Sequence, residues 1–197
     1  MVFLSKSELD RLVGQSYKTA AFSDSLQKSV TAEKLRLKTY DVFLSHSYLD
    51  KDTILKVNYA LEDLLGLSVF VDWIERPDID RNKVTPATAA ELRDVMDRCS
   101  SLIYAVSPNA ADSKWMPWEL GYSDAKHGRV AILPITDSTV TIAAYEHQEF
   151  VGIYPVIDIT EGMDIRDRTL WVNDRQNSKR YSRLKEWQRT GQLPVHS

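Results

Sequence analysis

From Tyr40 onward, short apolar runs of strand length alternate with segments whose apolar residues recur at helical spacing. This alternation restricts the fold strongly, because strands separated by helices assemble into a parallel sheet that helices cover on both faces. We therefore expect an α/β fold with a doubly wound, five-stranded, mainly parallel sheet. Pro155 lies inside the last run, which favours an edge strand because proline cannot donate a ladder hydrogen bond. The five predicted strands are residues 41–45, 67–71, 102–106, 129–135 and 150–157.

Capping residues mark the ends of two predicted helices. Asp52 is suited to begin the first helix, and Gly66 to end it, because glycine tolerates the left-handed conformation that often follows a helix. Residues 115–126 form the last helix of the core, which Gly128 ends. Each of these helices follows a predicted strand after a short loop, as the α/β pattern requires.

A third helix begins at Thr85 followed by Pro86, a good pair of capping and first-turn residues. Its apolar positions continue at helical spacing as far as Cys99, which we expect on the buried face of the helix. Residues 72–84 before it are polar and show neither the helical nor the strand period. They predict a long loop.

The two flanks have less regular patterns than the core. Residues 1–38 include a capping box, Ser5 with Glu8, and predict an N-terminal helical extension of two short helices. Residues 39–158 form the predicted core domain. Residues 159–197 are strongly charged but predict a C-terminal helical extension that packs on the core, because they also contain large apolar residues. These are Leu170, Trp171, Tyr181, Leu184 and Trp187.

Composition narrows the functional classes. The formal net charge is −3 and the basic residues form no stripe, so we expect no nucleic-acid partner. The longest apolar runs are too short to span a bilayer, so we expect no membrane association. A single cysteine cannot form an intramolecular disulfide, which fits a reducing compartment. These features predict a cytoplasmic protein.

The most informative segment for function is residues 113–122, which places the carboxylate of Glu119 beside Trp115 and Trp118. Four residues are about one helical turn, so Trp115 and Glu119 share one face of the predicted helix. A single acid among aromatic rings can bind and polarise a cationic ligand. The alternative is an ordinary first-turn glutamate favoured by the helix dipole, with the tryptophans as core residues.

Further polar and aromatic candidates lie at the carboxyl ends of predicted strands, where open α/β sheets bind their ligands. Ser45 and His46 end the first strand, Phe70 is near the end of the second, and Ser107 follows the third. The serines have a simpler alternative role, which is to satisfy backbone groups at strand ends. His46 could equally be a hydrogen-bonding loop residue.

The sequence lacks the residue spacing that dinucleotide-, calcium- and zinc-binding sites need. The seven glycines form no dinucleotide- or phosphate-binding pattern. Residues 78–82 begin like a calcium loop, but Lys83 occupies the position that requires glycine. The four histidines are too dispersed to suggest zinc. We therefore expect no metal site and no bound cofactor.

Three separated blocks resemble the successive sequence boxes of Toll/interleukin-1 receptor (TIR) domains, most closely those of bacteria. The blocks are residues 40–47, 69–72 and 107–119. The resemblance covers residues 39–158 and implies a flavodoxin-like fold. It also implies one of two activities. Some members cleave NAD⁺ between nicotinamide and ribose, giving ADP-ribose or a cyclic product that acts as a signal in antiphage or cell-death defence. Other members are adaptors.

The resemblance assigns roles to particular residues. The enzymatic members carry a glutamate four residues after a tryptophan, which matches Glu119 and Trp115. It implies that Glu119 is catalytic and that Trp115, Phe70, Ser45 and His46 bind the substrate NAD⁺. The partners implied are further copies of the TIR domain and a downstream effector that senses the nucleotide product.

The alternative is a non-catalytic assembly module that signals through contacts between TIR domains. Residues 72–84 correspond to the family's mobile loop after the second strand and would make such contacts. This loop lacks the usual proline-glycine element and has residues 76–81, Arg-Pro-Asp-Ile-Asp-Arg, in its place. The resemblance leaves open which activity applies and whether the product is linear or cyclic.

Overall fold

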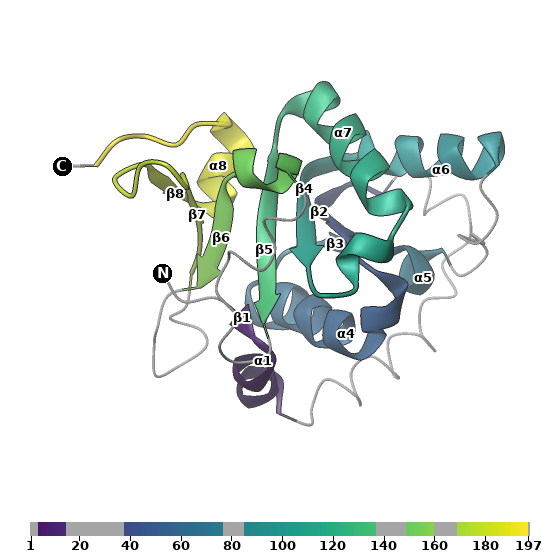
Figure 1. Ribbon diagram of the computed structural model, residues 1–197, viewed down its shortest axis with the longest axis horizontal. Coiled ribbons are helices and arrows are strands. Elements are labelled where there is room, and N and C mark those ends of the chain that lie inside the picture. Colours follow the sequence, from purple (N-terminus) through teal and green to yellow (C-terminus); the bar gives the residue numbers. More distant parts are fainter. Residues whose placement is uncertain (1–3, 15–37, 77–84, 137–148, 160–168, 197) are drawn as a thin grey trace.

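The computed structural model describes residues 4–14, 38–76, 85–136, 149–159 and 169–196 (Figure 1). Strands of its central sheet run parallel in the order β3-β2-β4-β5-β6. This order confirms the predicted doubly wound α/β fold and is the flavodoxin-like arrangement. The five parallel strands are β2 (Tyr40–Ser45), β3 (Val69–Phe70), β4 (Cys99–Val106), β5 (Val130–Thr136) and β6 (Val156–Ile159).

Helices cover both faces of the sheet (Figure 1). One face packs against α1 (Lys6–Val13), α4 (Lys51–Tyr59), its π-helical continuation η2 (Ala60–Leu64) and α8 (Leu184–Thr190). The other face packs against α6 (Pro86–Met96) and α7 (Trp115–His127). Shorter helical segments connect these elements. They are η1 (Tyr48–Asp50), α5 (Asp72–Glu75), η3 (Ala110–Asp112) and η5 (Glu149–Ile153).

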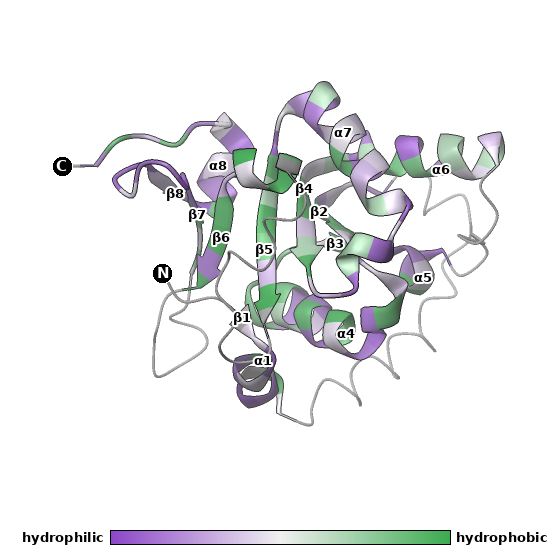
Figure 2. Cartoon of the chain, viewed as in Figure 1, coloured by the Kyte–Doolittle hydropathy of each residue, from purple (hydrophilic) through white to green (hydrophobic). Residues whose placement is uncertain are grey.

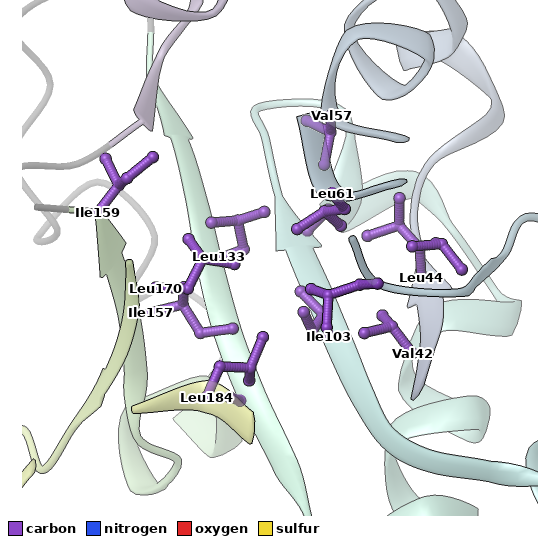
Figure 3. Packing of buried hydrophobic residues seen from close by; sticks show 14 of the residues in the cluster. Val42, Leu44, Val57, Leu61, Ile103, Leu133, Ile157, Ile159, Leu170 and Leu184 are labelled. Carbon is purple, nitrogen blue, oxygen red and sulfur yellow. The ribbon is translucent and has the colours of Figure 1, made fainter. Parts of the chain in front are cut away.

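The central strands contribute side chains to both hydrophobic cores in alternation. In β4, Leu102, Tyr104 and Val106 belong to the core beneath α6 and α7, whereas Ile103 and Ala105 belong to the core beneath α4. Figure 3 shows part of the α4 core, and Figure 2 shows hydrophobic residues along β5 and β6. Full burial of one such aliphatic side chain contributes about 1.5–3 kcal/mol.

The predicted helix boundaries hold except at the start of α4 and the end of α6. Thr85 caps α6 and accepts a hydrogen bond from the backbone of Thr88, while Gly66 and Gly128 adopt φ values of 62° and 65° after their helices. Asp52 does not begin its helix, because α4 starts at Lys51, directly after the turn η1.

Cys99 corrects the prediction for α6. The helix ends at Met96, and Cys99 begins β4, where it is paired with Tyr40 of β2. Helical spacing continues by chance through the turn, so periodicity alone misplaces the residue. The thiol remains buried and donates a hydrogen bond to the carbonyl of Val95 at 3.2 Å. Burial raises the pKa of the Cys99 thiol well above its usual range.

The prediction of an edge strand at residues 150–157 is wrong. Residues Glu149–Ile153 form η5, the strand β6 begins only after Pro155, and β7 (Leu170–Asn173) pairs with its outer side in the antiparallel direction. A second strand, β8 (Tyr181–Arg183), pairs antiparallel with β7. The C-terminal tail, expected to be helical, therefore extends the sheet by two strands before it forms α8.

The predicted loop 72–84 begins with the single-turn helix α5, and residues 77–84 lie outside the described part of the chain. The capping box of Ser5 and Glu8 begins α1 as predicted, whereas the second N-terminal helix falls outside the described residues. The short strand β1 (Leu4–Ser5) pairs in parallel with the end of β5. Within the described ranges, the structure contains no helix that is both long and apolar enough to cross a membrane.

Candidate active site

Glu119 lies one turn into α7 and its side chain is completely enclosed, with an exposed fraction of 0%. The hydroxyl of Ser45, the last residue of β2, donates a hydrogen bond to its Oε2 atom at 2.6 Å. Trp115, the first residue of α7, is buried one turn before it. The first and third sequence blocks thus meet at the carboxyl end of β2, and two of the predicted site residues touch directly.

His46 follows Ser45, and its ring contacts both β2 and α5. Its Nδ1 atom lies 2.8 Å from the carbonyl oxygen of Leu44, and the indole nitrogen of Trp73 in α5 donates to its Nε2 atom at 2.9 Å. A carbonyl only accepts and an indole N–H only donates, so the imidazole carries its proton on Nδ1. The Oδ1 atom of Asp72 lies 3.6 Å from Nε2. His46 therefore links the end of β2 to α5.

Phe70 and Trp115 lie in the hydrophobic core on the α6–α7 side of the sheet. The Phe70 ring stacks on Phe43 at 5.4 Å between centroids and meets the edge of Tyr40. Trp115 contacts Trp118 edge to face at 5.4 Å. The structure thus places both aromatic candidates in the core on the face of the sheet that carries α7.

A second polar cluster ties the loops after β2 and β4 together, and the residue at its centre, Asp50, is not among those predicted from the sequence. Asp50 is buried, and it accepts hydrogen bonds from the hydroxyl of Ser107 and, at 2.8 Å, from the side-chain amide of Asn109. Ser107 was identified from its position at a strand end. Asp50 has no comparable local signal, because an acid before a helix is usually a solvent-exposed cap.

The start of the segment after β3 is anchored by Glu75, the last residue of α5. Its buried carboxylate accepts a hydrogen bond from the hydroxyl of Tyr40 at 2.9 Å and lies 3.3 Å from the ammonium group of Lys38. Burial, together with the neighbouring negative charge of Glu75, raises the pKa of the Tyr40 hydroxyl well above its usual range. The contacts of Trp73 and Glu75 hold α5 against the two ends of β2.

The chemistry of this arrangement is electrostatic. A carboxylate surrounded by aromatic and aliphatic side chains acts in a low local dielectric, where its attraction for a positive charge is much stronger than in water. Among the described residues, the His, Cys, Asp and Glu side chains form no group of three or more that could hold a metal ion.

Comparisons with known proteins identify a family and relatives to which this chain is similar. The family model described as "TIR domain" matches residues 42–188. A Bacillus cereus (strain MSX-D12) protein named "Probable 3' cyclic ADP-D-ribose synthase ThsB'" is 38% identical over 185 residues, which cover 89% of this chain and 94% of that protein. A Cytobacillus dafuensis protein named "Putative cyclic ADP-D-ribose synthase TIR2" is 33% identical over 87 residues, 44% of this chain and 23% of that protein.

Among solved structures, the TIR domain of the Toll-related receptor TRR-2 from Hydra magnipapillata aligns with a TM-score of 0.40 and 17% identity. The alignment covers 56% of this chain and 80% of that one. The match of the family model to most of the chain, and the near full-length similarity to the Bacillus protein, are much stronger. The chain belongs to the TIR domain family.

Proposed function

We propose that this TIR protein cleaves the bond between nicotinamide and ribose in NAD⁺ and that Glu119 is its catalytic residue. The observation that carries the proposal is the enclosed carboxylate of Glu119, with Trp115 one turn away and Ser45 bonded to it. Family membership and the names of the two relatives support the same substrate. NAD⁺ is a substrate in this proposal, and no separate cofactor takes part.

The reaction needs a stabilised cation more than it needs a proton donor. Nicotinamide leaves the cationic pyridinium as a neutral molecule, and positive charge develops on the ribosyl group. A carboxylate about 4 Å from that charge stabilises it by about 1 kcal/mol in water but by about 4 kcal/mol at an effective dielectric constant of about 20. The larger value corresponds to a rate factor of about 1000. The enclosure of Glu119 therefore determines how strongly its carboxylate stabilises the ribosyl cation.

The four substrate-binding candidates would contribute unequally. Trp115 is the best placed to pack on the nicotinamide or ribose, because it is one turn from Glu119 and retains 8% of its surface exposed, against 1% or less for the other three. Phe70 and His46 would shape the pocket behind it. Water as the nucleophile gives ADP-ribose and attack from within the substrate gives a cyclic product; the names of the relatives favour the cyclic product.

In the cell, the nucleotide product would act as a signal in antiphage or cell-death defence, sensed by a separate effector. Self-association through the TIR domains would accompany this activity. A non-catalytic assembly module is the alternative, in which Glu119 has only a structural role.

The test is nicotinamide release from NAD⁺ by the purified protein, measured alone and under conditions that force self-association. We expect Glu119→Gln to lower the rate by about 1000-fold, the factor estimated above for an enclosed carboxylate. Glu186→Gln is the matched control, since Glu186 is exposed and paired with Arg189 in α8. Equal rates from the wild type and Glu119→Gln would contradict the catalytic role of Glu119, and equal traces of nicotinamide from both proteins would support the assembly module. Mass analysis of the product separates the linear from the cyclic form.

A further inference from the structure

The contact between Ser45 and Glu119 joins two elements that are 74 residues apart in the chain. Both side chains have an exposed fraction of 0%. The separation of 2.6 Å falls in the range of hydrogen bonds from a hydroxyl to a charged carboxylate, which are about 2.5–2.7 Å long. Such bonds are stronger than those between neutral groups, so this contact restrains both partners.

Ser45 is well suited to serve as the fixed partner. It ends β2, a strand that pairs with β3 on one side and β4 on the other, and it lies opposite Tyr104 in the register with β4. The next residue, His46, is held by Leu44 and Trp73. The backbone that carries the hydroxyl is therefore restrained by β4 on one side and, through His46, by α5.

Glu119, in contrast, has a longer side chain with several rotatable bonds, on a helix that packs over the sheet. A displacement of about 1 Å at a reacting group can lower a rate by about 100-fold. The serine hydroxyl has a single proton, and that proton is directed at Oε2 of Glu119. A substrate hydroxyl or phosphate would have to compete with a carboxylate for it.

We propose that Ser45 is a positioning residue, whose hydroxyl orients the carboxylate of Glu119 and does not bind NAD⁺ itself. This role rests on the proposed function of Glu119. It differs from the substrate-binding role that the sequence resemblance implies for Ser45, and the two roles predict different kinetics. A positioning residue affects kcat, whereas a residue that binds the substrate equally before and during the reaction affects KM.

A matched control lies on the neighbouring strand. Ser101 of β4 is also 0% exposed, and its hydroxyl donates to the carbonyl of Asp41 at 3.0 Å and accepts from Gln188 at 2.9 Å. It is paired in register with Val42, near the opposite end of β2 from Ser45. Ser101→Ala therefore removes a buried serine hydroxyl of the same kind without touching Glu119.

The kinetic experiment compares nicotinamide release by the wild type, Ser45→Ala, Ser45→Thr and Ser101→Ala. We expect Ser45→Ala to lower kcat by at least about 10-fold, the effect of losing one hydrogen bond to a charged group, with KM unchanged. Ser45→Thr keeps the hydroxyl and should recover most of the loss. Ser101→Ala should retain the wild-type kcat. A raised KM with normal kcat in Ser45→Ala, or an equal loss in Ser101→Ala, would overturn the proposal.

If the wild type releases no nicotinamide, the proposed function fails. The contact between Ser45 and Glu119 can still be tested by a measurement that needs no substrate. Unfolding by urea is followed for Ser45→Ala, Glu119→Met and the double variant. Each single change removes the hydrogen bond between the two side chains but leaves one of the polar groups buried, whereas the double change removes both groups. We expect the double variant to be more stable than the sum of the single losses predicts. Additive losses would show that the two side chains do not act as a pair and would also overturn the proposal.

Discussion

Buried polar side chains are stable when they are hydrogen-bonded, and at the carboxyl end of this sheet their partners come from other elements. Ser45 of β2 donates to Glu119 of α7, and Trp73 of α5 donates to His46. Ser107 after β4 donates to Asp50 before α4. The chemistry available to each residue is thus set by its partner. Ser45 is a candidate site residue because it ends a strand, but its contact with Glu119 favours a role other than substrate binding.

At the same scale, His127 predicts a pH dependence of stability. It ends α7, where the helix dipole would favour a positive charge, but burial, reinforced by the charge of Arg129, lowers its pKa below the usual 6.5. Its Nδ1 atom also accepts a hydrogen bond from the backbone of Arg129 at 3.0 Å. The folded state thus favours the neutral form, so this contribution is present above pH 6.5 and is lost as the pH falls through the folded pKa.

The change to make is His127→Asn, which keeps an acceptor near the position of Nδ1 but does not titrate. We expect the urea midpoint of the wild type to fall more between pH 7.5 and pH 5.5, values chosen on either side of about 6.5, than the midpoint of the variant. Parallel falls in the two proteins would show that His127 is not responsible.

At the scale of elements, β2 is contacted by helices at both of its ends. Its carboxyl end contacts α7 and α5, and its amino end contacts α5 through Tyr40 and α8 through the carbonyl of Asp41. The helix α5 has only four residues, too few to show a helical period. Its position depends on the tertiary contacts of Trp73 and Glu75, which is why a loop was predicted there.

Substitution of Gln188 tests how α8 is attached to the sheet. Its amide nitrogen is buried and donates to the carbonyl of Asp41 and the hydroxyl of Ser101, both at 2.9 Å. Gln188→Ala leaves these acceptors with fewer donors, and we expect a loss of about 1–3 kcal/mol in the free energy of unfolding. Gln192→Ala, at an exposed position just after α8, should be neutral. Equal urea midpoints for the two variants would contradict this account of how α8 is attached.

At the scale of the whole molecule, the C-terminal tail is continuous with the core. β7 and β8 extend the sheet beyond β6, and Leu184 and Trp187 of α8 join the same hydrophobic core as Val42 and Leu44. The family match, which runs to residue 188, includes this tail. Each of the two α8 side chains contributes about 1.5–3 kcal/mol by burial. A domain's net stability is about 5–15 kcal/mol, so the tail is a large part of the total.

Removal of residues 169–197 should therefore abolish cooperative unfolding or cause aggregation, because it exposes the outer edge of β6 and the apolar surface beneath α8. Removal of residues 192–197 alone should have a smaller effect, because Gln192, Pro194 and Val195 are exposed. Thermal unfolding followed by circular dichroism, with size-exclusion chromatography, distinguishes the two. A folded, monomeric protein that lacks residues 169–197 would refute the conclusion that the tail belongs to the core.

Local patterns in the sequence determined the α/β class, the approximate positions of the first four parallel strands, the helix ends at Gly66 and Gly128, and the placement of Trp115 and Glu119 on one helical face. These follow from short-range periods and capping preferences that residues express wherever they are placed. The resemblance to TIR domains came from the same local blocks, and the family match confirms it.

Only the tertiary structure decided which distant groups meet. It paired Ser45 with Glu119 and Asp50 with Ser107, placed Cys99 on β4 beside Tyr40, and covered the outer side of β6 with β7. No local pattern in the sequence predicts these contacts, because each depends on the free energy of burying and pairing groups that are far apart in the chain. The residues of the candidate site can thus be named from the sequence, but the contact that holds its carboxylate in place exists only after the sheet has formed.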